Sequence, residues 1–516
     1  MSKFFLSIVG FLSFSTLSFA QAGSIDTDFG SNGTTTFIPQ PLLNKAYGIA
    51  LQPDQKILIA GYALSGSANV FELARLMPNG TPDSAFGTDG LVQMLVGSDA
   101  VCYAIALQPD GKILLAGGAS SASNGSKDFT LLRFLPNGSL DSTFSGDGIQ
   151  TISFGIGDDI ARAVILQPDE HILIAGTSTN GNNSLMAIAR VKPNGTPDAT
   201  FSGDGKNTLA IGTIFTNAYA MALLSDGKIM LAGAAKFGMS DDIALARFLP
   251  SGVADVTFGI SGHIVTDLGS DADSGNAITI QDDGKMLVVG ITGATRDFAL
   301  LRYLPNGTLD PNFANQGHVL TDFAGSDDYA NAVLLQSDGK ILVGGYAYNG
   351  SLPDFAMARY LSDGTIDPNF GLNGLVTTDF SNGYDYGFPM AIQLDGKLLQ
   401  AGYSYSNGHT AFAVARYISG LDVGLLDPSA SNTAFISPNP VHQTAIFEFG
   451  ITQPGVFTLS LSDVHGQQVQ TFFRAKQFET GRQSESLLFS SNLPAGWYLL
   501  QLNGEGHQWT IKILKD

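Results

Sequence analysis

The segments AIALQPDGKILLAG (residues 104–117), DFTLLRFLPNG (residues 128–138) and DSTF (residues 141–144) form one unit that recurs along most of the chain. The arginine of this unit returns at intervals of 58, 57, 57, 55, 57 and 57 residues. The positions are Arg75, Arg133, Arg190, Arg247, Arg302, Arg359 and Arg416. A fixed period indicates a repeat architecture, in which each unit buries its apolar faces against its neighbours. The spacing predicts seven copies.

Each copy has the turn chemistry of a β-sheet unit. Asp-Gly between alternating apolar runs, as at Asp110-Gly111, is typical of a hairpin, and the other apolar runs predict about four short strands per copy. Parallel β-helix coils are shorter, roughly 20–30 residues, and helical solenoids do not tolerate a Pro-Asn-Gly turn in every unit. Four-stranded units arranged radially form a β-propeller. We therefore predict an all-β fold with a seven-bladed propeller over residues 24–420.

The ends of the repeat array predict how the ring closes. The motif Asp-x-x-Phe introduces the last strand of each unit, and its first copy, Asp26 to Phe29, precedes any hairpin. The last arginine run ends at Ile418 with no such strand behind it. We therefore expect residues 34–38 to complete the seventh blade, which covers sheet edges that would otherwise invite aggregation.

Composition excludes several classes of function. The 516 residues include 46 acidic and 26 basic side chains, and the formal net charge of −20 repels phosphate backbones, so nucleic acid is not expected as the partner. The single cysteine, Cys102, excludes a disulfide framework and a cysteine-based zinc site, and its apolar surroundings predict a core position. A monomer is expected.

The N-terminus has the pattern of a secretory signal peptide over residues 1–20. Lys3 precedes an apolar stretch that ends in small residues, which predicts cleavage between Ala20 and Gln21. An uncleaved membrane anchor is the alternative, but residues 4–19 are shorter than the roughly 20 that span a bilayer. The residue directly after the expected cleavage point is Gln21 and not cysteine, which disfavours a lipid anchor.

Beyond residue 420 the repeat ends. Residues 421–432 form a turn-rich linker, and a different β pattern occupies residues 433–516, enough for one small sandwich. Its landmarks are ISPNP (residues 436–440), LSDVHG (residues 461–466), LPAGWYLL (residues 493–500) and TIKILK (residues 510–515).

These patterns resemble two known families. The repeats are similar to the delta-60 repeats of secreted bacterial proteins, and the tail resembles the type A sorting domain of the type IX secretion system of Bacteroidota. The second resemblance implies an immunoglobulin-like sandwich that the translocon recognises and a sortase cuts, after signal-peptide-dependent passage through the periplasm. Secretion or outer-membrane surface localisation is then expected. The residues that carry this sorting motif are Pro438, Asn439, Pro440, Gly466, Leu493, Pro494, Ala495, Gly496 and Tyr498.

The repeated arginines share a strand face with apolar residues, so they are expected to be partly buried and to need an acidic partner. The sequence offers two candidate sets of acidic partners for these arginines. One is the aspartate of Asp-x-x-Phe, and the other is the recurring Asp128, Asp242, Asp297 and Asp354. Acidic turns such as Ser326-Asp327-Asp328 recur before the first strand of several blades. Calcium is a possible ligand of these turns, although none forms a complete EF-hand loop, and no other cofactor is expected.

The sequence contains no nucleophile elbow, no phosphate-binding loop and no metalloprotease helix, and no other catalytic motif appears. The uniform blades favour a binding or scaffold protein over an enzyme. We expect a secreted or surface-displayed propeller whose ligand is an extracellular glycan or protein. The alternative is a propeller hydrolase or lyase acting on glycans, with carboxylates in one blade at the central channel.

Overall fold

The computed structural model describes residues 21–37, 43–121, 125–269, 272–293, 295–380, 382–406, 408–420, 434–437, 443–451, 454–463, 468–490, 493–494, 496–504 and 507–515. The expected signal peptide with Ala20 and the linker at residues 421–432 lie outside these ranges, as do the sorting-motif residues Pro438, Asn439, Pro440, Gly466 and Ala495. Within the described part every regular element is a strand, and no helix there is suited to crossing a membrane. Contacts divide the chain into two units, residues 1–421 and 422–516.

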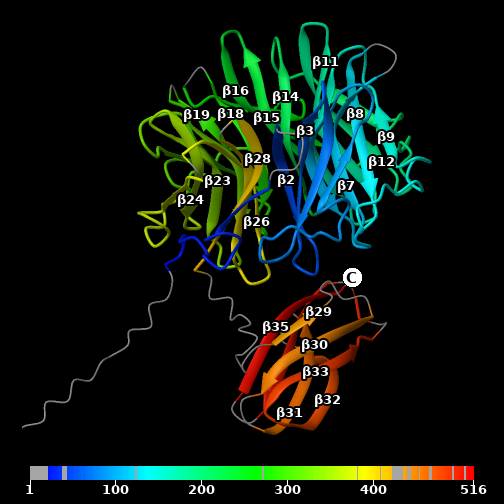
Figure 1. The fold of residues 1–516 in the computed structure, drawn as a ribbon, viewed down its shortest axis with the longest axis vertical. Helices are drawn as coiled ribbons and strands as arrows, with labels where there is room; N and C mark the ends of the chain where they lie inside the picture. Colours follow the sequence, from blue (N-terminus) through cyan, green and yellow to red (C-terminus); the bar gives the residue numbers. More distant parts are fainter. Residues whose placement is uncertain are drawn as a thin grey trace, which may run out of the picture. The chain divides into compact units, whose positions relative to one another are not determined.

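The first unit consists of seven four-stranded antiparallel sheets, which confirms the predicted seven-bladed propeller (Figure 1). Blades 1 to 6 begin with β2, β6, β10, β14, β18 and β22, and each contains four consecutive strands. Blade 7 contains β26, β27, β28 and β1.

The first strand of each blade faces the central axis. These strands are β2 (Asn44–Leu51), β6 (Ala100–Leu107), β10 (Asp159–Leu166), β14 (Thr216–Leu223), β18 (Ser274–Ile280), β22 (Asp328–Leu335) and β26 (Tyr384–Ile392). The second strands are β3 (Ile57–Ser65), β7 (Ile113–Ser120), β11 (Ile172–Asn180), β15 (Ile229–Phe237), β19 (Met286–Thr292), β23 (Ile341–Asn349) and β27 (Leu398–Ser406).

The third strands carry the repeated arginines. They are β4 (Ala68–Leu76), β8 (Lys127–Phe134), β12 (Asn183–Val191), β16 (Ser240–Phe248), β20 (Asp297–Tyr303), β24 (Leu352–Tyr360) and β28 (His409–Tyr417). The outer strands are short: β5 (Leu91–Met94), β9 (Ile149–Ile152), β13 (Lys206–Leu209), β17 (His263–Thr266), β21 (His318–Thr321), β25 (Leu375–Thr378) and β1 (Thr34–Phe37).

The N-terminal strand closes the ring, as predicted. β1 pairs antiparallel with β28, with Thr34 opposite Ala415 and Phe37 opposite Phe412. The N–H of Arg416 donates to the Gly33 carbonyl at 3.0 Å, and the N–H of Asp26 donates to the Arg416 carbonyl at 2.8 Å. The strand is seen over residues 34–37, and Ile38 lies outside the described residues.

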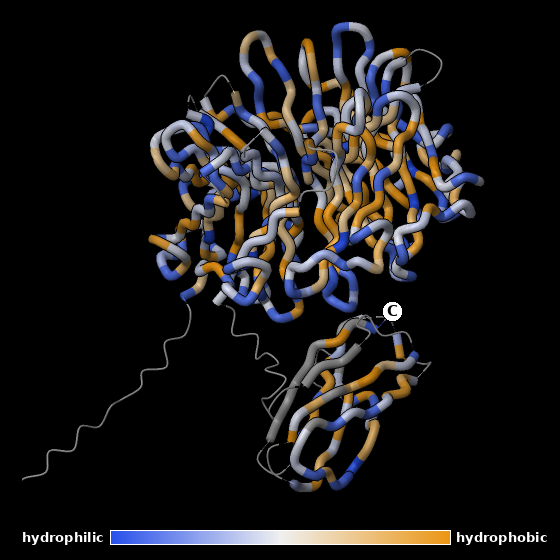
Figure 2. The backbone as a smooth tube through the Cα atoms, in the orientation of Figure 1, coloured by the Kyte–Doolittle hydropathy of each residue, from blue (hydrophilic) through white to orange (hydrophobic). Residues whose placement is uncertain are grey.

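The core lies between neighbouring blades. The phenylalanine of every Asp-x-x-Phe motif is fully buried, and between blades 1 and 2 it is Phe86, packed with Leu58, Ile113 and Phe134. Gly138 in the Pro-Asn-Gly turn of blade 2 has φ +90°, and a Cβ there would lie 2.9 Å from the Phe86 ring. Glycine is required at this turn both for its backbone conformation and for the close approach. Figure 2 shows the apolar residues along the strands and the polar ones at the turns.

The second unit contains two antiparallel sheets. One has the order β29 (Ala434–Ser437), β30 (Thr444–Ile451) and β33 (Gly481–Leu488). The other has the order β32 (Gln468–Phe478), β31 (Gly455–Asp463), β34 (Gly496–Gly504) and β35 (His507–Lys515). Buried aromatic and aliphatic residues of both sheets, among them Phe447, Phe457 and Leu500, form one core. The immunoglobulin-like assignment remains a prediction.

Candidate functional site: the central channel

Each first strand is interrupted by a β-bulge at the same position. In β2 the pairing with β3 skips from Ala46 to Gly48, which leaves Tyr47 without a partner in the ladder. A bulge bends the strand and re-aims the side chain of the extra residue. Equivalent skips occur in the other six first strands, and in β26 the skip covers two residues. The residues at this position are Tyr47, Tyr103, Arg162, Tyr219, Asn276, Asn331 and Phe388.

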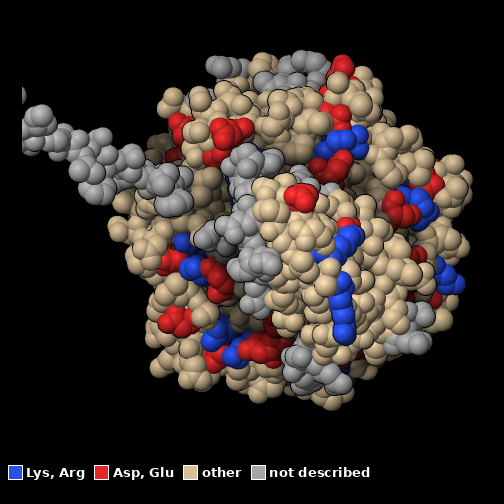
Figure 3. Space-filling model, turned by 90° about the horizontal axis from the view of Figure 1, so that it is seen from below, with Lys and Arg blue, Asp and Glu red and all other residues tan. Residues whose placement is uncertain are grey.

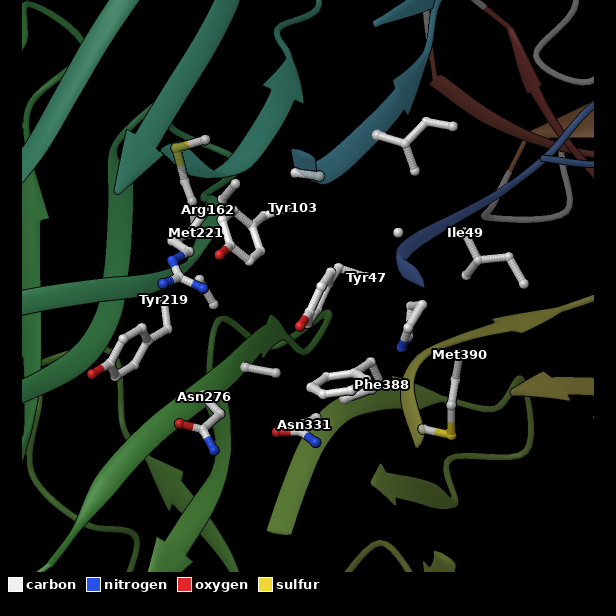
Figure 4. A pocket seen from close by; sticks show the side chains of 18 of the residues that line it. Tyr47, Ile49, Tyr103, Arg162, Tyr219, Met221, Asn276, Asn331, Phe388 and Met390 are labelled. Atoms are coloured by element: carbon white, nitrogen blue, oxygen red, sulfur yellow. The ribbon is translucent and has the colours of Figure 1, made fainter. Parts of the chain in front are cut away.

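These seven residues line one cavity of about 450 Å³ at the propeller axis (Figure 4). The residues beside them on each strand are small, for example Ala46 and Gly48 in β2. Small residues are needed where seven strands converge on one axis, since a larger side chain would meet the next blade. A Cβ added at Gly48 would lie 2.8 Å from Ile105 of blade 2.

One side of the cavity is an aromatic wall. The ring centroid of Tyr47 lies 4.8 Å from that of Phe388 and 5.0 Å from that of Tyr103. Tyr62 and Tyr403, on the second strands of blades 1 and 7, stack beside Tyr47 and Phe388 at 5.6 and 5.7 Å. Burial raises the pKa of Tyr47 above its ordinary value, so its phenol stays neutral even in alkaline solution.

The rest of the ring is polar. The side-chain amides of Asn276 and Asn331 each donate at 3.0 Å to a backbone carbonyl of the next blade, at Ala330 and Gly387, which fixes their orientation. The Arg162 guanidinium lies 3.9 Å from the Tyr103 ring centroid. In the described part of the chain Arg162 forms no ion pair, so its charge is available to a ligand.

The repeated arginines do not line this cavity. They pair with the aspartate of Asp-x-x-Phe, so the first of the two predicted sets of partners is the one seen. The Nε–Oδ2 distance is 2.8 Å for Arg133 and Asp141, and all seven pairs have distances between 2.7 and 3.0 Å. The acidic partners of Arg75, Arg133, Arg190, Arg247, Arg302, Arg359 and Arg416 are Asp83, Asp141, Asp198, Asp255, Asp310, Asp367 and Asp26.

Each arginine also connects neighbouring blades. Its guanidinium packs on the phenylalanine of its own motif, at 4.4 Å for Arg133 and Phe144, and Nη1 donates to a turn carbonyl of the next blade, at 2.6 Å for Pro193. Burial by itself raises the pKa of the Asp141 carboxyl. Hydrogen bonds from Thr143 and the positive charge of Arg133 outweigh it and hold this pKa below its ordinary value. Basic and acidic side chains lie next to one another on the propeller face in Figure 3. Each of the seven arginines therefore links two neighbouring blades.

The other set of aspartates lies elsewhere. Asp242, Asp297 and Asp354 begin or lie near the start of third strands, and each joins two further aspartates at the boundary with the next blade. The three groups are Asp242, Asp267 and Asp273; Asp297, Asp322 and Asp328; and Asp354, Asp379 and Asp385. In the second group burial, with the charges of Asp322 and Asp297, raises the pKa of Asp328 to about 7. Asp128 is not part of such a group of three among the described residues.

Other predicted residues take structural positions. Cys102 is fully buried in the core between blades 1 and 2, as predicted. Gln21, next to the expected cleavage point, donates from its side chain to the Gly371 carbonyl at 2.6 Å. In the tail, Leu493 packs against the core and the Tyr498 hydroxyl donates to the Pro494 carbonyl at 2.8 Å, just before Gly496 begins β34. These contacts hold Leu493 and Tyr498 in place beside the core of the second unit.

Comparison with protein families gives the same division of the chain. The model described as "Domain of unknown function (DUF5122) beta-propeller" matches seven times, at residues 52–86, 108–144, 167–201, 224–258, 281–313, 336–370 and 393–419. The propeller belongs to the DUF5122 family. The model of a secretion system C-terminal sorting domain matches residues 436–516. Both predicted resemblances are confirmed, and the sorting domain implies a secreted or outer-membrane surface location for this DUF5122 protein.

Solved structures show likeness in fold alone. A catalytically inactive variant of virginiamycin B lyase from Staphylococcus aureus with quinupristin is 13% identical over 74% of this chain and 98% of its own, with a TM-score of 0.42. The polysaccharide lyase Uly1 is 11% identical over 78% and 94%, also with 0.42. Trypanosoma rangeli sialidase with sialic acid is 9% identical over 96% and 88%, with 0.34. A comparison with curated proteins finds no match.

Proposed function

We propose that this DUF5122 protein is exported by its sorting domain and binds a short glycan bearing an acidic sugar in the central channel of its propeller. One observation carries the proposal: the bulge residue that reaches the channel varies among tyrosine, arginine, asparagine and phenylalanine, although the rest of the blade repeats. A purely structural position would be expected to repeat as the Arg–Asp pairs do. The seven bulge residues instead combine aromatic rings, two oriented amides and one arginine.

The chemistry of the cavity fits a sugar. The apolar faces of sugar rings pack on aromatic side chains such as Tyr47 and Phe388, and hydroxyl groups pair with amides and phenols. Arg162, with no acidic partner among the described residues, suits a carboxylate or sulfate, because a guanidinium binds such groups with two parallel hydrogen bonds. The cavity volume of about 450 Å³ falls in the range of about 300–1,000 Å³ typical of small-molecule sites.

A hydrolase or lyase acting on glycans is the alternative. Glycoside hydrolysis generally needs a pair of carboxylates flanking the scissile bond. The side chains that line the cavity are aromatic, amide, aliphatic and guanidinium groups, and this composition favours binding over hydrolysis. Incubation of the purified protein with any glycan that it binds tests the point. Release of new reducing ends would support a hydrolase, and release of unsaturated sugars would support a lyase.

Replacement of Tyr47 and Phe388 together by alanine is expected to weaken glycan binding by roughly tenfold or more, because buried aromatic contacts dominate binding energy. The measurement is a glycan array with the chain from residue 21 to 516, followed by titration calorimetry of the best ligand. Tyr384→Ala is the matched control, since Tyr384 also lies on β26 but is 41% exposed and outside the cavity. Equal loss in both variants, or no loss in either, would contradict the channel site.

Removal of residues 433–516 is expected to leave a folded propeller in the periplasm of a type IX-competent host. The two units have separate cores, so the propeller should not depend on the tail. Cell fractionation measures the location, and a reporter fused between a signal peptide and residues 433–516 should reach the surface. Surface arrival of the truncated protein would contradict the sorting assignment. Loss of the folded state after truncation would show that the tail supports the propeller.

A further inference from the structure

Three aspartates meet at the boundary between blades 5 and 6. Asp297 begins β20, Asp322 directly follows β21, and Asp328 begins β22 of the next blade. One carboxylate oxygen from each of the three lies within 4.8 Å of the others. The three side chains come from different elements, and the docking of two blades brings them together.

The hydrogen bonds of this group leave oxygens without donors. Asp328 is fully buried; its Oδ2 accepts the Phe323 N–H at 2.8 Å, but its Oδ1 has no hydrogen-bond partner among the described residues. Oδ1 of Asp322 accepts the Ala324 N–H at 3.0 Å, and Oδ1 of Asp297 accepts the Thr295 hydroxyl at 2.9 Å. Within the described part of the chain, each of the three carboxylates accepts hydrogen bonds on one oxygen only.

No basic side chain neutralises the group. Over the described residues neither Lys nor Arg forms an ion pair with Asp297, Asp322 or Asp328, and the neighbouring Arg296 pairs with Asp327 at 2.5 Å instead. A buried carboxylate oxygen without a donor is costly, and like charges at this separation repel strongly in a partly desolvated site. An additional group that supplies positive charge would relieve both costs.

We propose that Asp297, Asp322 and Asp328 bind a calcium ion at the boundary between blades 5 and 6. Calcium takes six to eight oxygen ligands at about 2.3–2.6 Å, mostly carboxylates, carbonyls and water. Three carboxylates that approach within 4.8 Å of one another meet part of that requirement, and water or carbonyl oxygens would supply the rest. Extracellular modules bind calcium with Kd values of about 10⁻⁴–10⁻³ M, which suits an exported protein.

Groups of three aspartates also lie at the next boundary on each side, between blades 4 and 5 and between blades 6 and 7. Asp385 between blades 6 and 7 is also fully buried, and its Oδ1 likewise has no hydrogen-bond partner in the described structure. At two other boundaries none of the three equivalent positions is an aspartate: they are Val70, Leu95 and Ala100 between blades 1 and 2, and Leu185, Ala210 and Thr216 between blades 3 and 4. Between blades 2 and 3 they are Asp128, Ser153 and Asp159. The group Asp354, Asp379 and Asp385 is therefore expected to bind calcium as well. In the group Asp242, Asp267 and Asp273, both oxygens of Asp273 accept hydrogen bonds, from the Thr292 hydroxyl and the Leu268 N–H, so no calcium site is proposed there. This inference does not depend on the proposed glycan site.

The test uses the chain from residue 21 to 516 after treatment with EDTA. Isothermal titration with calcium chloride is expected to show about two sites, and 10 mM calcium is expected to raise the Tm by roughly 5 °C or more, since the ion binds the folded state only. Asp328→Asn should remove one site and part of the Tm rise. Asp282→Asn is the matched control, because Asp282 is an exposed aspartate of the blade 5 hairpin outside the group.

Two results would overturn the proposal. One is the absence of both heat and a Tm shift at 10 mM calcium. The other is an equal calcium response in Asp328→Asn and Asp282→Asn. If Asp328→Asn does not fold by circular dichroism, Asp385→Asn takes its place, since Asp385 is the equivalent residue at the next boundary. Loss of one site in that variant supports the proposal, and an unchanged number of sites contradicts it.

Discussion

Deletion of residues 26–37 is expected to open the propeller and to make it associate, although it removes only one strand. β1 supplies the fourth strand of blade 7, so its loss exposes the edge of β28 to pairing with other molecules. It also removes Phe29, which is fully buried between blades 7 and 1, and Asp26, the acidic partner of Arg416. Loss of a buried phenylalanine and of one partner of a buried ion pair each costs about 3–5 kcal/mol.

Calorimetry and light scattering after size exclusion measure this effect. We expect a fall in Tm of more than about 10 °C and the appearance of oligomers, because the lost terms exceed about 5 kcal/mol together. A chain that begins at Ser24 is the control, since it keeps Asp26, Phe29 and β1. An unchanged Tm with a monomeric profile in the deletion variant would show that β1 does not close the ring.

Arg359→Ala is expected to destabilise the propeller by about 3–5 kcal/mol, because Asp367 is left buried without its charged partner. The side chains of Arg359 and Asp367 are only 4% and 1% exposed, and their Nε–Oδ2 distance is 2.9 Å. Arg359 also donates to the Ser419 carbonyl and packs on the Phe370 ring at 4.5 Å. The substitution therefore removes an ion pair, a cation–π contact and a hydrogen bond at once.

Urea unfolding of both variants measures the difference in free energy of unfolding. Lys228→Ala is the matched control, since it removes one positive charge from an exposed hairpin pair with Asp226, and it should cost less than about 1 kcal/mol. A similar small cost for Arg359→Ala would mean that the Arg–Asp pairs contribute little to stability. Arg247→Ala should lie between the two, because the Arg247 side chain is 13% exposed.

Much of the fold could be predicted from local patterns. The Asp-Gly hairpins, the apolar alternation and the 57-residue period depend on neighbouring residues, so they specify strands, turns and the number of blades. The unpaired Asp-x-x-Phe at Asp26 and the missing last strand after Ile418 also predicted the closure by β1. The sorting domain was predicted from its motifs, whereas its export function does not follow from any contact in the structure.

The channel site was not among the sites predicted from the sequence. The channel residues occupy the fourth position of five first strands, the third of β18 and the fifth of β26. Their identity varies among Tyr, Arg, Asn and Phe, while the flanking residues stay small. The aligned repeats show this variation, but nothing local to the position distinguishes a channel residue from a residue paired within the sheet. A period-2 pattern also places this residue within the ladder, and only the bulge turns it into the channel.

The sequence by itself determined the repeat, its sevenfold number, the closing strand and the sorting tail, because each depends on contacts between residues adjacent in the chain or on a pattern that recurs. Only the tertiary structure decided between the two sets of partners for the arginines, since both lie at plausible separations along the chain. It alone brought Asp297, Asp322 and Asp328 together, and it alone gathered Tyr47, Arg162 and Phe388 around one cavity. These groupings depend on how the twisted blades dock and where the strands bulge, and interactions between residues far apart in the chain govern both.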